Sequence, residues 1–170
     1  VVQFNDISLC SAIIRLLDTI LTRAIVTDDV AFETNFVFCV IWGLGSVLTI
    51  ADDGTNYRDM FSTWFRSKFN KQVKIPSRDT IFDYWLDPRT SKFDTWKASP
   101  AFSTVDFDSS VMNMAEITVP TAETASVSFW LDKLIQTGSH VMLAGPAGTG
   151  KTALVNGLLH NLNPEQHIHT

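Results

Sequence analysis

Residues 145–152 constrain the fold of this chain more than any other part of its sequence. They read Gly-Pro-Ala-Gly-Thr-Gly-Lys-Thr and fit the pattern G-x-x-x-x-G-K-[ST], the Walker A motif. This loop joins a strand to a helix, so it predicts an α/β fold of the P-loop class. An apolar run at 140–144 precedes it, and apolar residues at helical spacing follow over 153–162. The sequence therefore predicts a buried parallel strand, the loop and a helix in succession.

Each residue type in the motif suits a polyphosphate ligand. Glycines permit backbone conformations and a close approach that side chains block, so successive N–H groups can turn toward phosphate oxygens. Lys151 would bridge the β and γ oxygens, and the Thr152 hydroxyl would bind Mg²⁺. The positive end of the following helix favours the same negative charge. We therefore expect ATP or ADP with Mg²⁺ as ligands. The expected phosphate-binding residues are Gly145, Pro146, Ala147, Gly148, Thr149, Gly150, Lys151 and Thr152.

The sequence after the loop does not complete a hydrolytic site. Only 18 residues follow Thr152, and Glu165 is their sole carboxylate. Hydrolysis needs acidic groups that hold the metal and polarise water, and a residue that stabilises the γ-phosphate. We therefore assign no catalytic residue and expect these 170 residues to bind nucleotide without hydrolysing it alone. Val1 and Thr170 are interpreted as truncation points.

Helices are predicted for most of the chain before residue 70. Apolar residues recur at helical spacing over 7–25, 30–48 and 57–68, and Asp6 is a plausible cap of the first helix. A hairpin is predicted next, with strands at 81–86 and 92–96 around a turn at 88–91.

Two further segments lie between the hairpin and the loop. Residues 98–114 are rich in Ser and Asp, have weak periodicity and are interpreted as a connector. Thr121 then predicts the N-cap of a helix that carries Glu123 in its first turn and ends before Gly138.

Composition and charge argue against several other classes. The chain is 45 % hydrophobic and 18 % charged, as in packed globular proteins. Its net charge of −5 disfavours nucleic acid as a partner, and the apolar run 36–50 is shorter than a membrane span. Cys10 and Cys39 lack metal-ligand spacing and are expected to be buried, reduced thiols, which suits a cytosolic compartment. We expect neither nucleic acid nor a membrane as partner.

Several short sequence segments on both sides of the connector resemble one and the same protein family. They are residues 36–45, 57–61, 80–87 and Trp96 upstream, and residues 117–124, 129–134 and 141–152 downstream. Together they resemble the end of the second AAA+ module and the start of the third module of a dynein heavy chain. The spacing is most similar to axonemal, outer-arm beta-type chains. One departure is Ala-Ser-Val-Ser at 125–128, where dyneins commonly have Val or Ile followed by Arg.

The resemblance implies an architecture. Residues 1–70 would be the small all-helical subdomain of one AAA+ module, residues 71–114 a short hairpin and connector, and residues 115–170 the start of the next large α/β subdomain. By the same resemblance, Val119, Pro120 and Thr121 would lie near the adenine. Plain helix capping is the alternative interpretation of these three residues.

The resemblance also implies a function in an ATP-driven microtubule motor ring, with a regulatory nucleotide site at the loop. Its partners would be neighbouring AAA+ modules of the same chain, other dynein heavy, intermediate and light chains, and, through other parts of the chain, the microtubule. Its place would be the cytoplasmic cytoskeleton, in the axoneme of a cilium or flagellum. Two alternatives stay open: a structural joint between modules with permanently bound nucleotide, and an unrelated P-loop kinase or GTPase.

Overall fold

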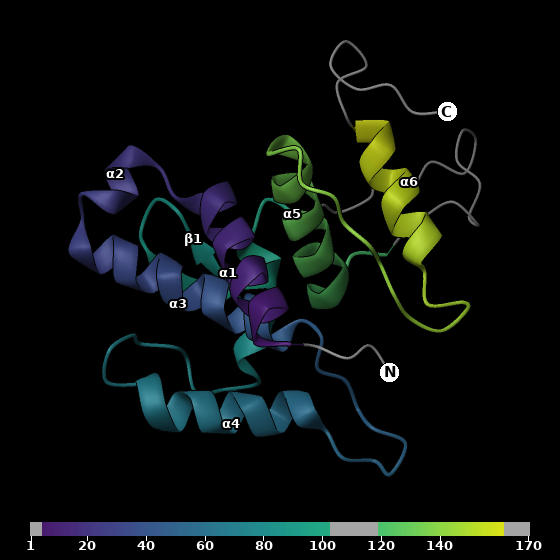
Figure 1. Ribbon diagram of the computed structural model, residues 1–170, viewed down its shortest axis with the longest axis horizontal. Coiled ribbons are helices and arrows are strands. Elements are labelled where there is room, and N and C mark those ends of the chain that lie inside the picture. The colour runs from purple at the N-terminus through teal and green to yellow at the C-terminus, as the bar shows by residue number, and fades with distance from the viewer. Residues whose placement is uncertain (1–4, 103–118, 162–170) are drawn as a thin grey trace. The chain divides into compact units, whose positions relative to one another are not determined.

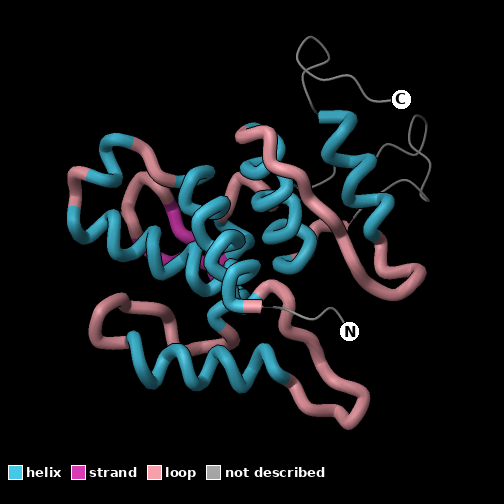
Figure 2. Tube along the Cα trace, in the orientation of Figure 1, coloured by secondary structure: helices cyan, strands magenta, loops and turns pink. Residues whose placement is uncertain are grey.

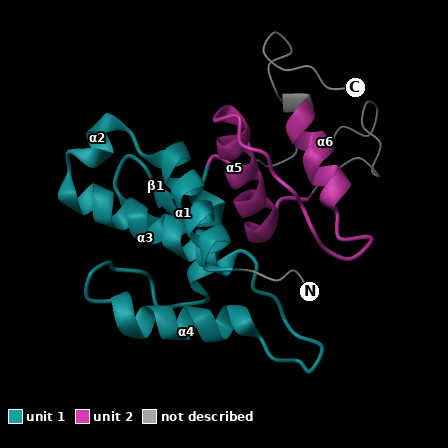
Figure 3. Ribbon diagram, in the orientation of Figure 1, with its two compact units in different colours: residues 1–99 teal, residues 100–170 magenta. Residues whose placement is uncertain are grey.

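The computed structural model describes residues 5–102 and 119–161, which fall into two compact units (Figure 1). One unit comprises residues 1–99 and the other residues 100–170 (Figure 3). The first contains helices α1 to α4 and a two-stranded hairpin, and the second contains α5 and α6. The predicted connector lies outside the described residues from position 103 onward. The domain boundaries at residues 70 and 114 stay predictions.

The first predicted helix is two helices, α1 (Asp6–Ile20) and α2 (Arg23–Val26). The prediction of one helix over 7–25 is wrong because Leu21 is extended and the Thr22 hydroxyl accepts a hydrogen bond from the Ile25 N–H, which starts a new helix. Asp6 is not the cap of α1. The Asn5 side chain caps it by accepting from the Ser8 N–H at 2.8 Å, and Asp6 lies in the first turn.

Helix α3 (Asp29–Gly45) is the central element of the first unit, as its apolar sequence predicts. The Asp28 carboxylate caps it by accepting from the N–H groups of Val30 and Ala31, both at 3.0 Å. Helix α1 packs closely against α3. A Cβ atom built on Gly43 would lie 2.6 Å from Ile13 Cγ1, so glycine permits this close approach.

The hairpin brings an aromatic core to α3. The Trp96 side chain is fully buried, and its Nε1 donates to the Phe82 carbonyl oxygen at 2.8 Å. The Trp42 ring meets Trp96 and Phe82 edge-to-face, at centroid distances of 5.8 and 5.6 Å. These contacts attach the hairpin to the helical layer, so both form one core.

Helix α4 (Tyr57–Phe69) agrees with its predicted range, and its Arg66 side chain organises the segment that follows it. The Arg66 guanidinium donates to the carbonyl oxygens of Pro76 at 2.7 Å and Asp79 at 2.8 Å. The Ser62 hydroxyl on the same helix accepts from the Ile81 N–H at 3.1 Å. Side-chain hydrogen bonds from α4 thus hold residues 76–80, which form no regular element, and the first residue of the short helix that follows them.

The predicted hairpin is present, with its first strand shorter than expected. The elements are η1 (Ile81–Asp83), β1 (Tyr84–Asp87), β2 (Lys92–Thr95) and η2 (Trp96–Ala98). Strands β1 and β2 are antiparallel, with Tyr84 opposite Thr95. Residues 81–83 form a 3₁₀ turn because the Asp83 carboxylate accepts from the N–H and the hydroxyl of Thr80, at 2.8 and 2.6 Å.

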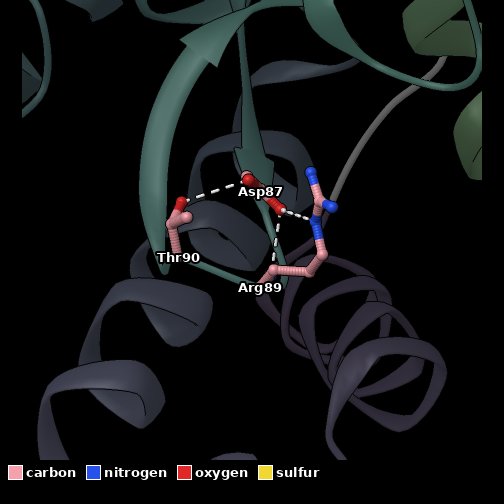
Figure 4. Close-up of polar contacts among 3 residues, drawn as sticks. All are labelled: Asp87, Arg89 and Thr90. Atoms are coloured by element: carbon pink, nitrogen blue, oxygen red, sulfur yellow. Dashed lines mark hydrogen bonds and ion pairs between the residues drawn. The ribbon is translucent and has the colours of Figure 1, made fainter.

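The hairpin turn is held by one carboxylate, that of Asp87 (Figure 4). Asp87 accepts from the Arg89 N–H at 2.9 Å and from the Thr90 hydroxyl at 3.2 Å. The hydrogen bond from Arg89 lowers the pKa of Asp87 because it stabilises the charged form. This local closure explains why 88–91 is a turn, as its sequence predicts.

The two cysteines differ in exposure. Cys39 is buried in α3 as expected, and burial raises its pKa to about 12. Cys10 is exposed, which contradicts the prediction, because it lies outside the apolar stripe of α1, on the side of the exposed Ile7 and Ile14. No helix in the described part of the chain combines the length and the hydropathy needed to cross a membrane.

Candidate functional site

Six of the predicted phosphate-binding residues, 145–150, form a loop, and the other two, Lys151 and Thr152, begin the helix that follows it, α6 (Lys151–Asn161). Gly148 and Gly150 have φ angles of +79° and +77°, a region that side chains disfavour. A Cβ atom at either position would have no neighbour within 4 Å. The glycines therefore leave the loop surface open, as the close approach of a phosphate requires.

The Lys151 ammonium folds back across this loop. Its Nζ donates to the carbonyl oxygens of Gly145 at 3.0 Å and Pro146 at 2.6 Å, and to the Thr149 hydroxyl at 3.1 Å. The Thr149 hydroxyl in turn donates to the Pro146 carbonyl oxygen at 2.9 Å. Positive charge is thus concentrated at the loop. The sequence analysis includes Thr149 as a phosphate-binding residue but does not predict this hydrogen bond to Lys151. A hydroxyl residue two positions before the lysine was the available sequence signal for it.

Helix α6 begins directly at the end of the loop. The Leu154 N–H donates to the Gly150 carbonyl oxygen at 3.0 Å, which closes the first turn, and Thr152 is exposed within that turn. Leu154, Val155, Leu158 and Leu159 are half-buried, in agreement with the predicted apolar face. The helix N-terminus adds a positive electrostatic field beside the glycines.

The apolar run 140–144 forms no strand, so that prediction is wrong. Figure 2 draws the whole connection between α5 and α6 as loop, and Val141 and Met142 are exposed. A parallel strand is stable only when neighbouring strands satisfy its backbone groups. The only sheet among the described residues is the β1–β2 hairpin of the other unit.

Val119, Pro120 and Thr121 lead into α5 (Ala122–Gln136). Thr121 is the N-cap, as predicted, and its hydroxyl accepts from the Thr124 N–H at 3.1 Å. Val119 is 70 % exposed. Helices α5 and α6 pack against each other, and within residues 119–161 no recorded hydrogen bond joins 119–121 to the loop. The eight residues 145–152 thus lie together at the N-terminal end of α6, whereas Val119, Pro120 and Thr121 lie at the N-terminal end of α5.

These residues fit a nucleotide phosphate group chemically. The site combines open glycine backbone, one ammonium and a helix N-terminus, and it has the Thr152 hydroxyl for a magnesium ion. The described residues contain no cluster of three His, Cys, Asp or Glu side chains that could hold a metal ion. Magnesium at such a loop takes most of its ligands from phosphate and water, so this donor set is compatible with it.

Two family models match the chain. One, described as the dynein heavy chain AAA lid domain, covers residues 1–98 and hence more than half of the sequence. The chain belongs to the dynein heavy chain family. The second model, the P-loop containing dynein motor region, covers residues 107–170. A dynein lid followed by the start of a P-loop module confirms the predicted fold class and excludes the unrelated kinase or GTPase.

Individual dynein heavy chains are similar along most of these residues. The chain is 42 % identical to the dynein alpha chain of the flagellar outer arm of Chlamydomonas reinhardtii, over 82 % of its length. It is 37 % identical to human dynein axonemal heavy chain 9 and 33 % identical to the ciliary dynein beta chain of Heliocidaris crassispina, each over 99 % of its length. It spans only 3 to 4 % of these relatives. Since alpha and beta chains both match, the beta-type assignment stays a prediction.

Proposed function

We propose that residues 145–152 form a regulatory ATP or ADP site in the motor region of an axonemal dynein heavy chain. The observation that carries this proposal is the open glycine loop with the Lys151 ammonium folded onto it, in the part of the chain that matches the dynein P-loop region. We assign the lid to the end of the second AAA+ module and the loop to the third. Motor activity would belong to the whole heavy chain, in the axoneme of a cilium or flagellum.

The loop residues have distinct roles in this proposal. Backbone N–H groups of residue 145 and of residues 147–150 bind phosphate oxygens, and the Lys151 ammonium neutralises charge on the β and γ groups. Thr152 provides its hydroxyl to Mg²⁺, and the ion, when bound, neutralises further phosphate charge. By the same proposal Val119, whose apolar side chain is exposed, would lie near the adenine together with Pro120 and Thr121. Because these 170 residues contain no assignable catalytic group, hydrolysis at this site would require residues from other parts of the heavy chain.

The test is nucleotide protection of the loop in the intact heavy chain. Hydrogen exchange of peptides that span 145–159 is measured with and without ADP and Mg²⁺. Bound nucleotide should slow exchange in the wild type, because ligand binding stabilises the loaded state. Lys151→Ala should abolish most of this protection. Lys71→Ala removes an exposed lysine in the other unit and is the matched control. Equal protection in Lys151→Ala and the wild type would refute the assignment.

A second function places the same loop in a rigid joint that holds nucleotide permanently. The compact lid, with its continuous helical and aromatic core, favours a structural contribution. Exchange of labelled ADP during motor turnover separates the two functions. Release coupled to microtubule detachment supports the regulatory site, and retention over many turnovers supports the joint. In either case the partners would be neighbouring AAA+ modules and the other dynein chains, with the microtubule bound elsewhere in the heavy chain.

A further inference from the structure

Helix α4 carries three large apolar side chains that the described part of the first unit leaves partly exposed. Tyr57, Met60 and Trp64 are 46, 59 and 48 % exposed. They occupy positions i, i+3 and i+7 of the helix, so they form one apolar stripe along it. A shallow groove includes part of this stripe and is lined by Asp59, Met60, Thr63, Trp64 and Ser67. Figure 1 shows α4 at the edge of the first unit.

The Trp64 ring is held by its neighbours although the residue is half exposed. It meets the rings of Phe61 and Phe65 at centroid distances of 5.7 and 6.2 Å, and the ring of Phe69 at 6.2 Å. Phe65 itself is fully buried. Because these rings already fix the indole, a partner that covers it loses little side-chain entropy. Trp64 therefore has the properties of an interface anchor.

Positive charge is concentrated directly after this stripe. The basic segment, residues 66–78, contains five Lys and Arg and no Asp or Glu, in a chain whose net charge is −5. Four of the five are exposed, and no hydrogen bond or ion pair of their side chains is recorded within the described residues: Lys68, Lys71, Lys74 and Arg78. Cations that are gathered in this way attract an anionic partner.

The basic segment has an ordered backbone. Val73 and Ile75 are buried on either side of the exposed Lys74, which anchors this part of the segment to the core. Near its end, the guanidinium of Arg66 donates to carbonyl oxygens on both sides of Arg78, at 2.7 and 2.8 Å. The cations are therefore displayed in a fixed arrangement, which favours a partner with a complementary arrangement of charge.

The apolar stripe and the cations together select one class of partner. Apolar side chains at helical spacing pack against the apolar face of a second helix, and the cations pair with carboxylates beside that face. Nucleic acid and anionic membranes are polyanions, and a net charge of −5 disfavours both. We propose that the apolar stripe of α4 and the basic segment bind an acidic amphipathic helix of a separate polypeptide. This inference is independent of the proposed nucleotide site.

The composition of this surface favours a separate polypeptide over another part of the heavy chain. Permanent contacts are mostly apolar, whereas non-obligate interfaces surround a small apolar centre with a polar rim. Here three apolar side chains are bordered by the hydroxyls of Thr63 and Ser67 and by the four cations. The cations also speed the encounter with an oppositely charged partner that diffuses freely, and a covalently attached segment does not need this effect.

The probe is a labelled synthetic heptad-repeat helix with leucine at positions a and d and glutamate at positions e and g. Fluorescence anisotropy measures its affinity for the intact heavy chain. A carbodiimide, which joins amines to carboxylates, then shows by mass spectrometry which lysines the probe contacts. Two matched probes separate the two parts of the surface. One has lysine in place of glutamate, and the other has serine in place of leucine.

The glutamate helix should cross-link to Lys68, Lys71 and Lys74, and both matched probes should bind at least tenfold more weakly. Trp64→Ala should weaken binding of the glutamate helix about tenfold, as expected for the loss of an interface anchor. Equal affinity for the glutamate and serine probes would overturn the role of the apolar stripe. Absence of binding of the glutamate helix to the wild type would overturn the proposal as a whole.

Charge reversal tests the basic segment separately from folding. Lys68→Glu combined with Lys71→Glu should weaken binding of the glutamate helix more than tenfold and strengthen binding of the lysine helix, and this reversal also shows that the variant is folded. Lys92→Glu combined with Lys97→Glu removes two exposed lysines elsewhere in the same unit and should change neither affinity. Equal effects of the two pairs would overturn the assignment to the basic segment.

The native source of the helix is tested by the same carbodiimide in the purified axonemal dynein complex. Lysines of the basic segment should be joined to Asp or Glu residues of a polypeptide other than this heavy chain, and those residues should flank apolar ones at helical spacing. Cross-links only to carboxylates of the heavy chain itself would overturn the assignment to a separate polypeptide. Absence of any carboxylate cross-link would exclude an acidic protein partner and leave a nucleic acid or lipid ligand.

Discussion

Replacing Gly43 by alanine tests whether the contact between α1 and α3 is as close as the structure indicates. The new Cβ would lie 2.6 Å from Ile13 Cγ1 and 3.2 Å from Ile13 Cα and N, so the backbone of α1 would also have to move. Overpacking of this kind costs about 1 to 3 kcal/mol. Alanine recovers up to about 1 kcal/mol through its higher helix propensity. We therefore expect a net loss of roughly 1 to 2 kcal/mol.

Hydrogen exchange of α1 and α3 peptides in the intact heavy chain measures this loss. Local opening should become about 5 to 30 times more frequent in Gly43→Ala. Gly157→Ala in α6, where the new Cβ meets nothing within 4 Å, is the control and should slow exchange of its own helix. In an Ile13→Ala background the Gly43→Ala substitution should cost less, because one contact partner is gone. Unchanged or slower exchange in Gly43→Ala alone would refute the reasoning.

Two further predictions concern Arg66 and the cysteines. Arg66→Lys should make hydrogen exchange of peptides over 76–83 about tenfold faster, because a single ammonium cannot reproduce the forked hydrogen bonds to Pro76 and Asp79. The control is Arg78→Ala, which removes an exposed arginine from the same segment. Equal exchange rates in the two variants would contradict the role of Arg66. Iodoacetamide should modify the exposed Cys10 in the native protein and leave the buried Cys39 unmodified. Burial raises the pKa of Cys39 from 9.0 to about 12, so near pH 9 only the unfolded state loses the thiol proton. The contribution of Cys39 to the free energy of unfolding is therefore full below pH 9 and declines as the pH rises toward 12. Melting at pH 8 and pH 10 should show a smaller decline in Cys39→Ala than in the wild type.

The sequence predicts those elements whose signals are local. The Thr121 cap, the 88–91 turn and the long helices predicted over 30–48 and 57–68 follow from side chains that bond their own neighbours or recur at helical spacing, although the first of these helices already ends at Gly45. The eight residues 145–152 are predicted to bind phosphate for the same reason, because the motif is contiguous in the sequence. Errors arise where two local signals compete, as at Thr22, whose hydroxyl starts a second helix, and at Asp83, whose carboxylate closes a 3₁₀ turn.

Residues 145–152 and their chemistry are determined by the sequence itself, since glycine, lysine and threonine at those positions are sufficient to define a P-loop. Only the tertiary structure shows that the Lys151 ammonium is engaged by the Thr149 hydroxyl and by two carbonyl oxygens, and that Cys10 is exposed while Cys39 is buried. The same is true of 140–144, which has the sequence of a strand but forms none among the described residues. A strand, a buried thiol and a bound ammonium each depend on groups that the rest of the fold brings near, and sequence spacing alone does not specify those neighbours.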